Sequence, residues 1–137
     1  LVINGGSRLS ADNLIIDGSN QDASSEEQGL RIWGNSLAWI DNLTISNNQK
    51  YGIVIWLSNF ATPVTGDINL KNNSRSIHIG KNASFSSKGE LNISGSNNIS
   101  IYVTEGHFLS NNGSININES TGTYFYSYGS KNKFKKY

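Results

Sequence analysis

The chain has 137 residues, of which 36% are hydrophobic and 15% charged, with 14 Gly, one Pro and no Cys or Met. This length fits one domain, the lack of Cys excludes disulfides and thiol chemistry, and the 20 Asn and 21 Ser disfavour a helical protein. The net charge of +1 and the lack of a long apolar run mean that neither nucleic acid binding nor membrane insertion is expected. Because the chain opens with Leu1 and contains no Met, we expect a fragment of a longer protein.

A first family of short segments recurs along the chain, each with two apolar residues separated by one residue. Such alternation is typical of a strand with one buried and one solvated face. The pairs are Leu14/Ile16, Leu43/Ile45, Ile68/Leu70, Leu91/Ile93 and Ile115/Ile117. Their first members are 29, 25, 23 and 24 residues apart, which indicates a repeat.

A second family of segments lies between the members of the first and shares its period. Its pairs are Leu30/Ile32, Ile53/Ile55, Ile77/Ile79, Ile99/Ile101 and, less regularly, Thr123/Phe125, with steps of 23, 24, 22 and 24 residues. A third, weaker series precedes the first family and consists of Leu9, Leu37, Val64, Phe85, Phe108 and Phe134. Each period therefore carries three short predicted strands.

Three half-buried strands cannot close a core within one period, so successive periods must stack, each strand lying parallel to its equivalent one period on. The sequence predicts an all-β fold, a single parallel β-helix of about five coils of roughly 24 residues, over residues 1–137. The usual handedness of parallel crossovers favours right-handed winding. Turn residues mark the corners at 46–48, 71–73, 95–98 and 111–113.

Three segments fall outside the repeat. Residues 20–28 are polar and acidic without periodicity, so we expect a loop that leaves the first coil. Residues 60–63 include the only Pro, which cannot donate to a strand ladder, so we expect a corner or loop there. Residues 121–137 are rich in aromatic and then basic residues, and we expect them to end the last coil.

The repeat carries a resemblance to known proteins. Asp41–Asn48 (DNLTISNN), followed by Gly52–Ile55 (GIVI), resembles the repeat of pectate-lyase-like right-handed parallel β-helices. The later coils, with Gly89–Gly95, Ile99–Val103 and Ser110–Ile115, resemble the shafts of bacteriophage tail spikes and tail fibres. They are equally similar to passenger domains of bacterial autotransporter adhesins. The resemblance implies an architecture that hosts lyases, hydrolases, adhesins and structural stalks.

Aromatic side chains fall on the outer face of the second family in this register. One outward column reads Trp33, Trp56, Gly80, Tyr102 and Tyr126, and its neighbour reads Arg31, Val54, His78, Ser100 and Tyr124. Exposed Trp and Tyr suit a subunit interface, a sugar-stacking platform or a ladder that stabilises adjacent rungs, and these alternatives stay open. The candidate binding or interface residues are Trp33, Trp56, Tyr102, Tyr124, Tyr126, Arg31 and His78.

The outer face of the first family predicts a polar ladder. One column contains Thr44, Asn69, Asn92 and Asn116 after Ile15, and stacked amides can hydrogen-bond along it or contact sugar hydroxyls. A second column places Asp67 and Glu90 on adjacent rungs, which makes them weak candidates for acid–base work on a glycosidic bond. The predicted face is flat and lacks a cleft, so structural carboxylates are the favoured interpretation.

No metal site or cofactor is predicted. The two histidines, His78 and His107, fall on different strand families, and neither has an acidic cluster beside it. Phosphate-binding loops and serine nucleophile motifs are absent from the sequence.

These features and the resemblance lead to one expected function and two alternatives. We expect a non-catalytic segment of an extracellular attachment protein, most like a phage tail spike or fibre, that presents or forms a face binding a surface glycan. The tail-fibre resemblance implies a homotrimer that buries the aromatic column, on a virion tail or bacterial surface, with a cell-surface polysaccharide or another bacterial surface receptor as partner. The alternatives are an autotransporter adhesin passenger and a polysaccharide lyase or glycoside hydrolase.

Overall fold

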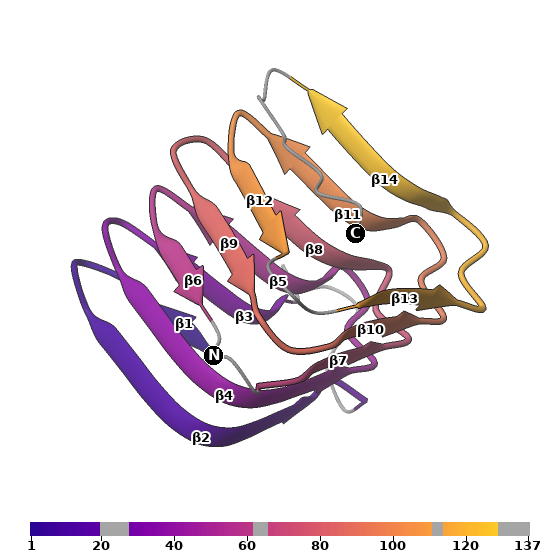
Figure 1. The fold of residues 1–137 in the computed structure, drawn as a ribbon, viewed down its shortest axis with the longest axis horizontal. Helices are drawn as coiled ribbons and strands as arrows, with labels where there is room; N and C mark the ends of the chain where they lie inside the picture. Colours follow the sequence, from indigo (N-terminus) through magenta and orange to yellow (C-terminus); the bar gives the residue numbers. More distant parts are fainter. Residues whose placement is uncertain (20–27, 62–65, 111–113, 129–137) are drawn as a thin grey trace.

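The computed structural model describes residues 1–19, 28–61, 66–110 and 114–128 (Figure 1). These residues form a parallel β-solenoid in which stacked strands are about 24 residues apart, and within the described ranges there is no helix. The predicted all-β solenoid is therefore confirmed. The count of about five coils and the right-handed winding stay predictions.

Six strands stack in chain order into one sheet, here named sheet A, which runs from the indigo end to the yellow end in Figure 1. They are β1 (Val2–Ile3), β3 (Gln28–Trp33), β5 (Tyr51–Trp56), β8 (Arg75–Ile79), β11 (Ile99–Thr104) and β14 (Thr123–Tyr128). Each is parallel to its neighbours. These strands correspond to the second predicted family.

The other eight strands form sheet B, which wraps the remaining sides of the solenoid. They are β2 (Arg8–Asp17), β4 (Leu37–Ser46), β6 (Asn59–Ala61), β7 (Ile68–Lys71), β9 (Ser84–Ser87), β10 (Leu91–Ser94), β12 (His107–Ser110) and β13 (Ile115–Asn118). In the first two coils the third and first predicted families merge into one long bent strand, β2 or β4, which pairs along its length with the other (Figure 1). In the later coils β9 and β10 are separate strands, so only there does a period hold three short strands.

The core consists of inward aliphatic residues and a column of phenylalanines. Leu30, Ile53, Ile77 and their counterparts from both sheets are fully buried. Phe60, Phe85 and Phe108 stack with ring centroids 5.1 Å and 5.4 Å apart and ring planes within 9° and 4° of parallel. Offset stacking of this kind adds to the burial of large apolar rings.

The phenylalanine column corrects two predictions. Phe60 is buried in β6 and pairs with Ala38 on one side and Phe85 on the other, so residues 60 and 61 are strand and not a corner. The third series therefore runs through Ala38 and Phe60 in place of Leu37 and Val64, and Val64 lies outside the described residues. For Phe60 the physical reason is that a large ring fills the core better than a small apolar side chain such as Val. A count of the spacing between apolar residues does not include side-chain size.

Left-handed backbone conformations close the predicted corners at 46–48, 71–73 and 95–98. Asn47, Asn72 and Gly95 have φ values of 60°, 54° and 67°, a region that Asn and Gly tolerate best. The buried Asn73 secures the corner: its Nδ2 donates to the Ile45 carbonyl at 2.9 Å, and its Oδ1 accepts from the Asn48 backbone N at 3.1 Å. The turn chemistry seen in the sequence is thus confirmed at these three corners.

The irregular segments fall mostly outside the described residues. This applies to 20–27 of the expected loop, to the expected turn at 111–113 and to 129–137 of the C-terminal segment. Gln28, placed in the loop by the sequence, instead begins β3 and pairs with Tyr51.

Candidate functional site

The register of β11 differs by two residues from the predicted one. Ile101, and not Ile99, pairs with the core residue Ile77. Ile99 pairs with Arg75 and lines the outer surface. The predicted alignment of the Ile99/Ile101 pair with Ile77/Ile79 is therefore wrong, and the outward columns change from the fourth coil onward.

A small buried residue before the first core residue of β3, β5, β8 and β11 explains this register. These residues are Gly29, Gly52, Ser76 and Ser100. A Cβ at Gly52 would lie 2.8 Å from the carbonyl oxygen of Ser76, so no side chain fits at Gly52. Ser100 is buried and lies in register with Ser76, which corrects its predicted place in the outward column of His78. The repeated Gly or Ser followed by Leu or Ile is the sequence signal that would have given the correct alignment.

The corrected register gathers four rings into one row on the outer face of sheet A, called here the aromatic row: Tyr51, His78, Tyr102 and Tyr126. The His78 ring lies between Tyr51 at 5.5 Å and Tyr102 at 4.6 Å, with ring planes within 25° of parallel. Tyr126 follows at 5.4 Å from Tyr102. Tyr102 and Tyr126 therefore belong to the column of His78 and Arg31, and not to the column of the tryptophans as predicted.

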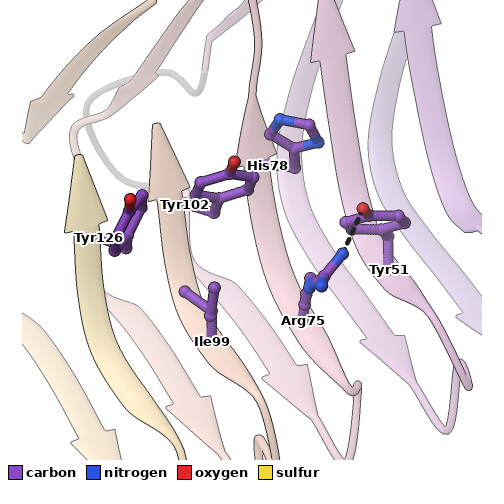
Figure 2. A pocket seen from close by; sticks show the side chains of 6 residues that line it. All are labelled: Tyr51, Arg75, His78, Ile99, Tyr102 and Tyr126. Atoms are coloured by element: carbon purple, nitrogen blue, oxygen red, sulfur yellow. Dashed lines mark hydrogen bonds between the residues drawn. The ribbon is translucent and has the colours of Figure 1, made fainter. Parts of the chain in front are cut away.

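A groove of about 410 Å³ lies along the aromatic row (Figure 2). Arg75 and Ile99 complete its lining. The Arg75 guanidinium lies 5.2 Å from the centre of the Tyr51 ring, and its Nη1 donates to the Tyr51 hydroxyl at 2.6 Å. The rings stack partly on one another, so the groove offers their exposed edges and the rest of their apolar surface beside a cation and phenolic hydroxyls. Tyr51, Arg75 and Ile99 form one column at the start of their strands, and none of the predicted outward columns includes that position.

The imidazole of His78 is neutral in this setting. Burial, followed by the nearby positive charge of Arg75, lowers the pKa of His78 to about 4. Its Nε2 lies 3.1 Å from Thr104 Oγ1, within hydrogen-bonding distance. Trp56 contacts the same ring edge-on at 5.8 Å. His78 therefore acts at neutral pH as an uncharged ring within the row.

The two predicted tryptophans form a separate, neighbouring column. Trp33 pairs with Trp56, and Arg31 lies 4.6 Å over the Trp33 ring. The Trp56 ring covers Gly80, where any Cβ would overlap it. Both tryptophans are exposed, as are Tyr124, on β14, and Trp39, which lies on β4 of sheet B and was not singled out from the sequence.

The polar ladder lies on sheet B. Asn92 Nδ2 donates to Asn69 Oδ1 at 3.2 Å, and Asn116 Nδ2 donates to Asn92 Oδ1 at 2.9 Å. Thr44 pairs with Asn69 and continues the column toward the N-terminal coils. These amides satisfy one another between rungs, which stabilises the stack.

The Asp67 side chain is used in a similar way, with the backbone of Glu90 as its partner. Asp67 Oδ1 accepts a hydrogen bond from the Glu90 backbone N at 2.9 Å, just as Asn42 Oδ1 accepts from the Asp67 backbone N at 3.3 Å. The Asp67 carboxylate thus occupies the place of an amide in a rung-to-rung contact. This arrangement favours a structural role for it over acid–base catalysis.

A second, polar depression of about 310 Å³ lies at a corner of the solenoid and was not foreseen from the sequence. Its lining residues are Asn47, Asn48, Gln49, Asn72, Ser74 and Asn97. Asn47 Nδ2 donates to Asp17 Oδ1 at 2.9 Å, and Asn72 Nδ2 donates to Asn47 Oδ1 at 3.3 Å. Its amides are thus engaged with one another, and it lacks the ring faces of the groove.

The part of the chain that the structure describes contains no group of three or more His, Cys, Asp or Glu able to hold a metal ion. Nor does that part contain a helix long and apolar enough to cross a membrane. Comparison of the chain with protein-family models, with curated proteins and with solved structures found no match.

Proposed function

We propose that this chain is a non-catalytic segment of an extracellular attachment protein, and that the groove along the aromatic row binds a surface glycan. The single observation that carries the proposal is the row itself, a line of aromatic rings with phenolic hydroxyls on the outer face of the solenoid, in which Tyr126 is the most exposed ring. Pyranose rings have apolar faces that stack on aromatic rings and hydroxyls that need hydrogen-bond partners. The resemblance of the repeats to phage tail spikes and fibres suggests a virion tail, and the adhesin resemblance suggests a bacterial surface.

A glycan array tests this proposal with a matched control. Tyr126, in the row, and Trp39, on sheet B, are 46% and 44% exposed, so they offer similar apolar area to solvent. We expect the Tyr102→Ser, Tyr126→Ser double variant to lose glycan binding and the Trp39→Ser variant to keep it. Loss in both variants, or binding by no glycan in the wild-type chain, would contradict the proposal.

A homotrimer is the second proposed property, and a different observation favours it. Exposed apolar residues gather on β1, β3, β5 and the corner after β5: Leu1, Val2, Trp33, Trp56 and Leu57. Apolar surface of this kind often marks a subunit interface. Light scattering should give three times the chain mass for the wild type and a single chain mass for the Trp33→Ser, Trp56→Ser variant. A monomer in both would favour the autotransporter passenger alternative.

The enzyme alternative has a direct test. If Asp67 and Glu90 act on a glycosidic bond, the Asp67→Asn, Glu90→Gln variant should lose turnover of a polysaccharide that the wild-type chain cleaves. We expect no cleavage by either protein, because Asp67 takes part in a rung-to-rung hydrogen bond on the outer face of sheet B.

A further inference from the structure

The outer face of sheet A is positively charged. The six strands of sheet A contain two arginines, Arg31 and Arg75, and no Asp or Glu. By contrast, the strands of sheet B contain three acidic residues, Asp12, Asp17 and Asp41, and two basic ones, Arg8 and Lys71. The two sheets therefore offer different electrostatic environments, although the net charge of the whole chain is only +1.

The groove contains the Arg75 cation without a neutralising partner. In the described part of the chain, the only side-chain hydrogen bond of Arg75 is the one from Nη1 to the Tyr51 hydroxyl. Its Nε is buried without a hydrogen-bond acceptor, which costs free energy in the unliganded protein. His78 lies in the middle of the row and is neutral at pH 7. No carboxylate comes from the remaining lining residues, which are Tyr51, Ile99, Tyr102 and Tyr126. A ligand cannot reach the buried Nε, but Nη2 and the second N–H of Nη1 retain hydrogen-bonding capacity that an anion can use.

We propose that the groove selects acidic glycans, with sugar rings of the chain packed against Tyr102 and Tyr126 and the carboxylate of another sugar in the same chain paired with Arg75. A planar guanidinium binds a carboxylate through paired, charge-assisted hydrogen bonds, so Arg75 supplies selectivity that ring stacking alone does not. This inference rests on the proposed function, since it names the class of glycan that the same groove binds.

Single-stranded nucleic acid also stacks on aromatic rings, but the charge of the face favours the glycan. A nucleic acid strand carries one negative charge per nucleotide, and proteins that bind it line the path of the backbone with several basic residues. The groove has one arginine. A sugar chain with occasional carboxylates matches one cation beside a row of rings better.

The test compares matched acidic and neutral ligands on the wild-type chain. The first probe is an array of sialylated, uronate-containing and neutral glycans. The second is a matched pair: an oligosaccharide of alternating glucuronate and N-acetylglucosamine, and the same oligosaccharide with its carboxylates reduced to alcohols. The third is a single-stranded oligonucleotide. We expect binding to the acidic glycans, at least tenfold weaker binding to their reduced or neutral counterparts, and weakening of the acidic binding as salt is raised.

Variants at Arg75 separate selectivity from binding itself. Arg75→Gln should weaken binding of an acidic glycan about tenfold or more and weaken binding of its neutral counterpart by a much smaller factor. Arg75→Lys, which keeps the charge without the planar fork, should restore part of the loss. Arg8→Gln, on β2 of sheet B, is the control and should bind as the wild type does.

The outcomes distinguish this inference from the function on which it rests. Equal binding of acidic and neutral glycans, or an Arg75→Gln variant with unchanged affinity for acidic ones, would overturn the acidic selectivity and leave glycan binding in place. Binding of the oligonucleotide in preference to the array would overturn the selectivity and the glycan ligand together. Binding of no glycan at all would overturn the proposed function as well.

Discussion

Replacing Phe85 by Ala tests the packing of the solenoid at its most demanding point. Phe85 is fully buried, and its ring stacks between Phe60 at 5.1 Å and Phe108 at 5.4 Å. Truncating a buried Phe to Ala typically costs about 3–5 kcal/mol of unfolding free energy. Two lost stacking contacts, each worth roughly 0.5–1.5 kcal/mol, place Phe85→Ala near the upper end of that range.

Urea denaturation of the two proteins, followed by circular dichroism, measures this difference. Ser86→Ala is the control on the same strand, since Ser86 is only half-buried, and it should change the unfolding free energy by less than about 0.5 kcal/mol. A loss below about 1.5 kcal/mol in Phe85→Ala would mean that the phenylalanine column does not support the stack as described.

Three further predictions address the corner, the aromatic row and the tryptophan column. Asn73→Ala leaves the Ile45 carbonyl and the Asn48 backbone N without their partner, so urea denaturation should show a loss of about 2–4 kcal/mol; a loss within error would refute the role of Asn73. The folded-state pKa of His78 is about 4, below its ordinary 6.5, so protonation of His78 favours the unfolded chain. The unfolding free energy should therefore be full above pH 6.5 and fall toward pH 4 by no more than about 3 kcal/mol. The His78→Gln variant should lose this pH dependence. The same slope in His78→Gln would assign the pH dependence to other groups. Gly80→Ala places a Cβ where the Trp56 ring lies, so Trp fluorescence should shift to longer wavelength with a cost of about 1–3 kcal/mol; an unchanged spectrum would contradict the contact.

The sequence predicts the solenoid because its repeat is redundant. Each core pair of the first family, such as Leu43/Ile45 and Leu91/Ile93, aligns with its equivalents in the structure. A one-residue error in the register of one coil would move its apolar residues from the core to the solvent face. The alternation alone therefore determines the register of the first family. Asn69 and Asn92 likewise form the outward ladder because Asn side chains on adjacent rungs can satisfy one another.

The aromatic row could not be predicted from alternation alone. Ile99, Ile101 and Val103 are all apolar, so two registers two residues apart both bury apolar side chains. The structure selects the one that buries Ser100 and pairs Ile101 with Ile77. The choice depends on how large a side chain fits at the position just before the first core residue of the strand. A count of the spacing between apolar residues does not include this size limit. The place of Ile99 beside Arg75 and of Tyr102 beside His78 follows from that choice.

Nuclear magnetic resonance mapping of a bound glycan tests directly whether the aromatic row is the binding surface. The labelled chain is titrated with the glycan that binds most tightly on the array, and the backbone amide shifts are followed. We expect changes in the amide chemical shifts to be confined to β5, β8, β11 and β14, around Tyr51, His78, Tyr102 and Tyr126. Shifts confined to the amide ladder of sheet B, or around Trp39, would contradict the claim that the aromatic row is the binding surface.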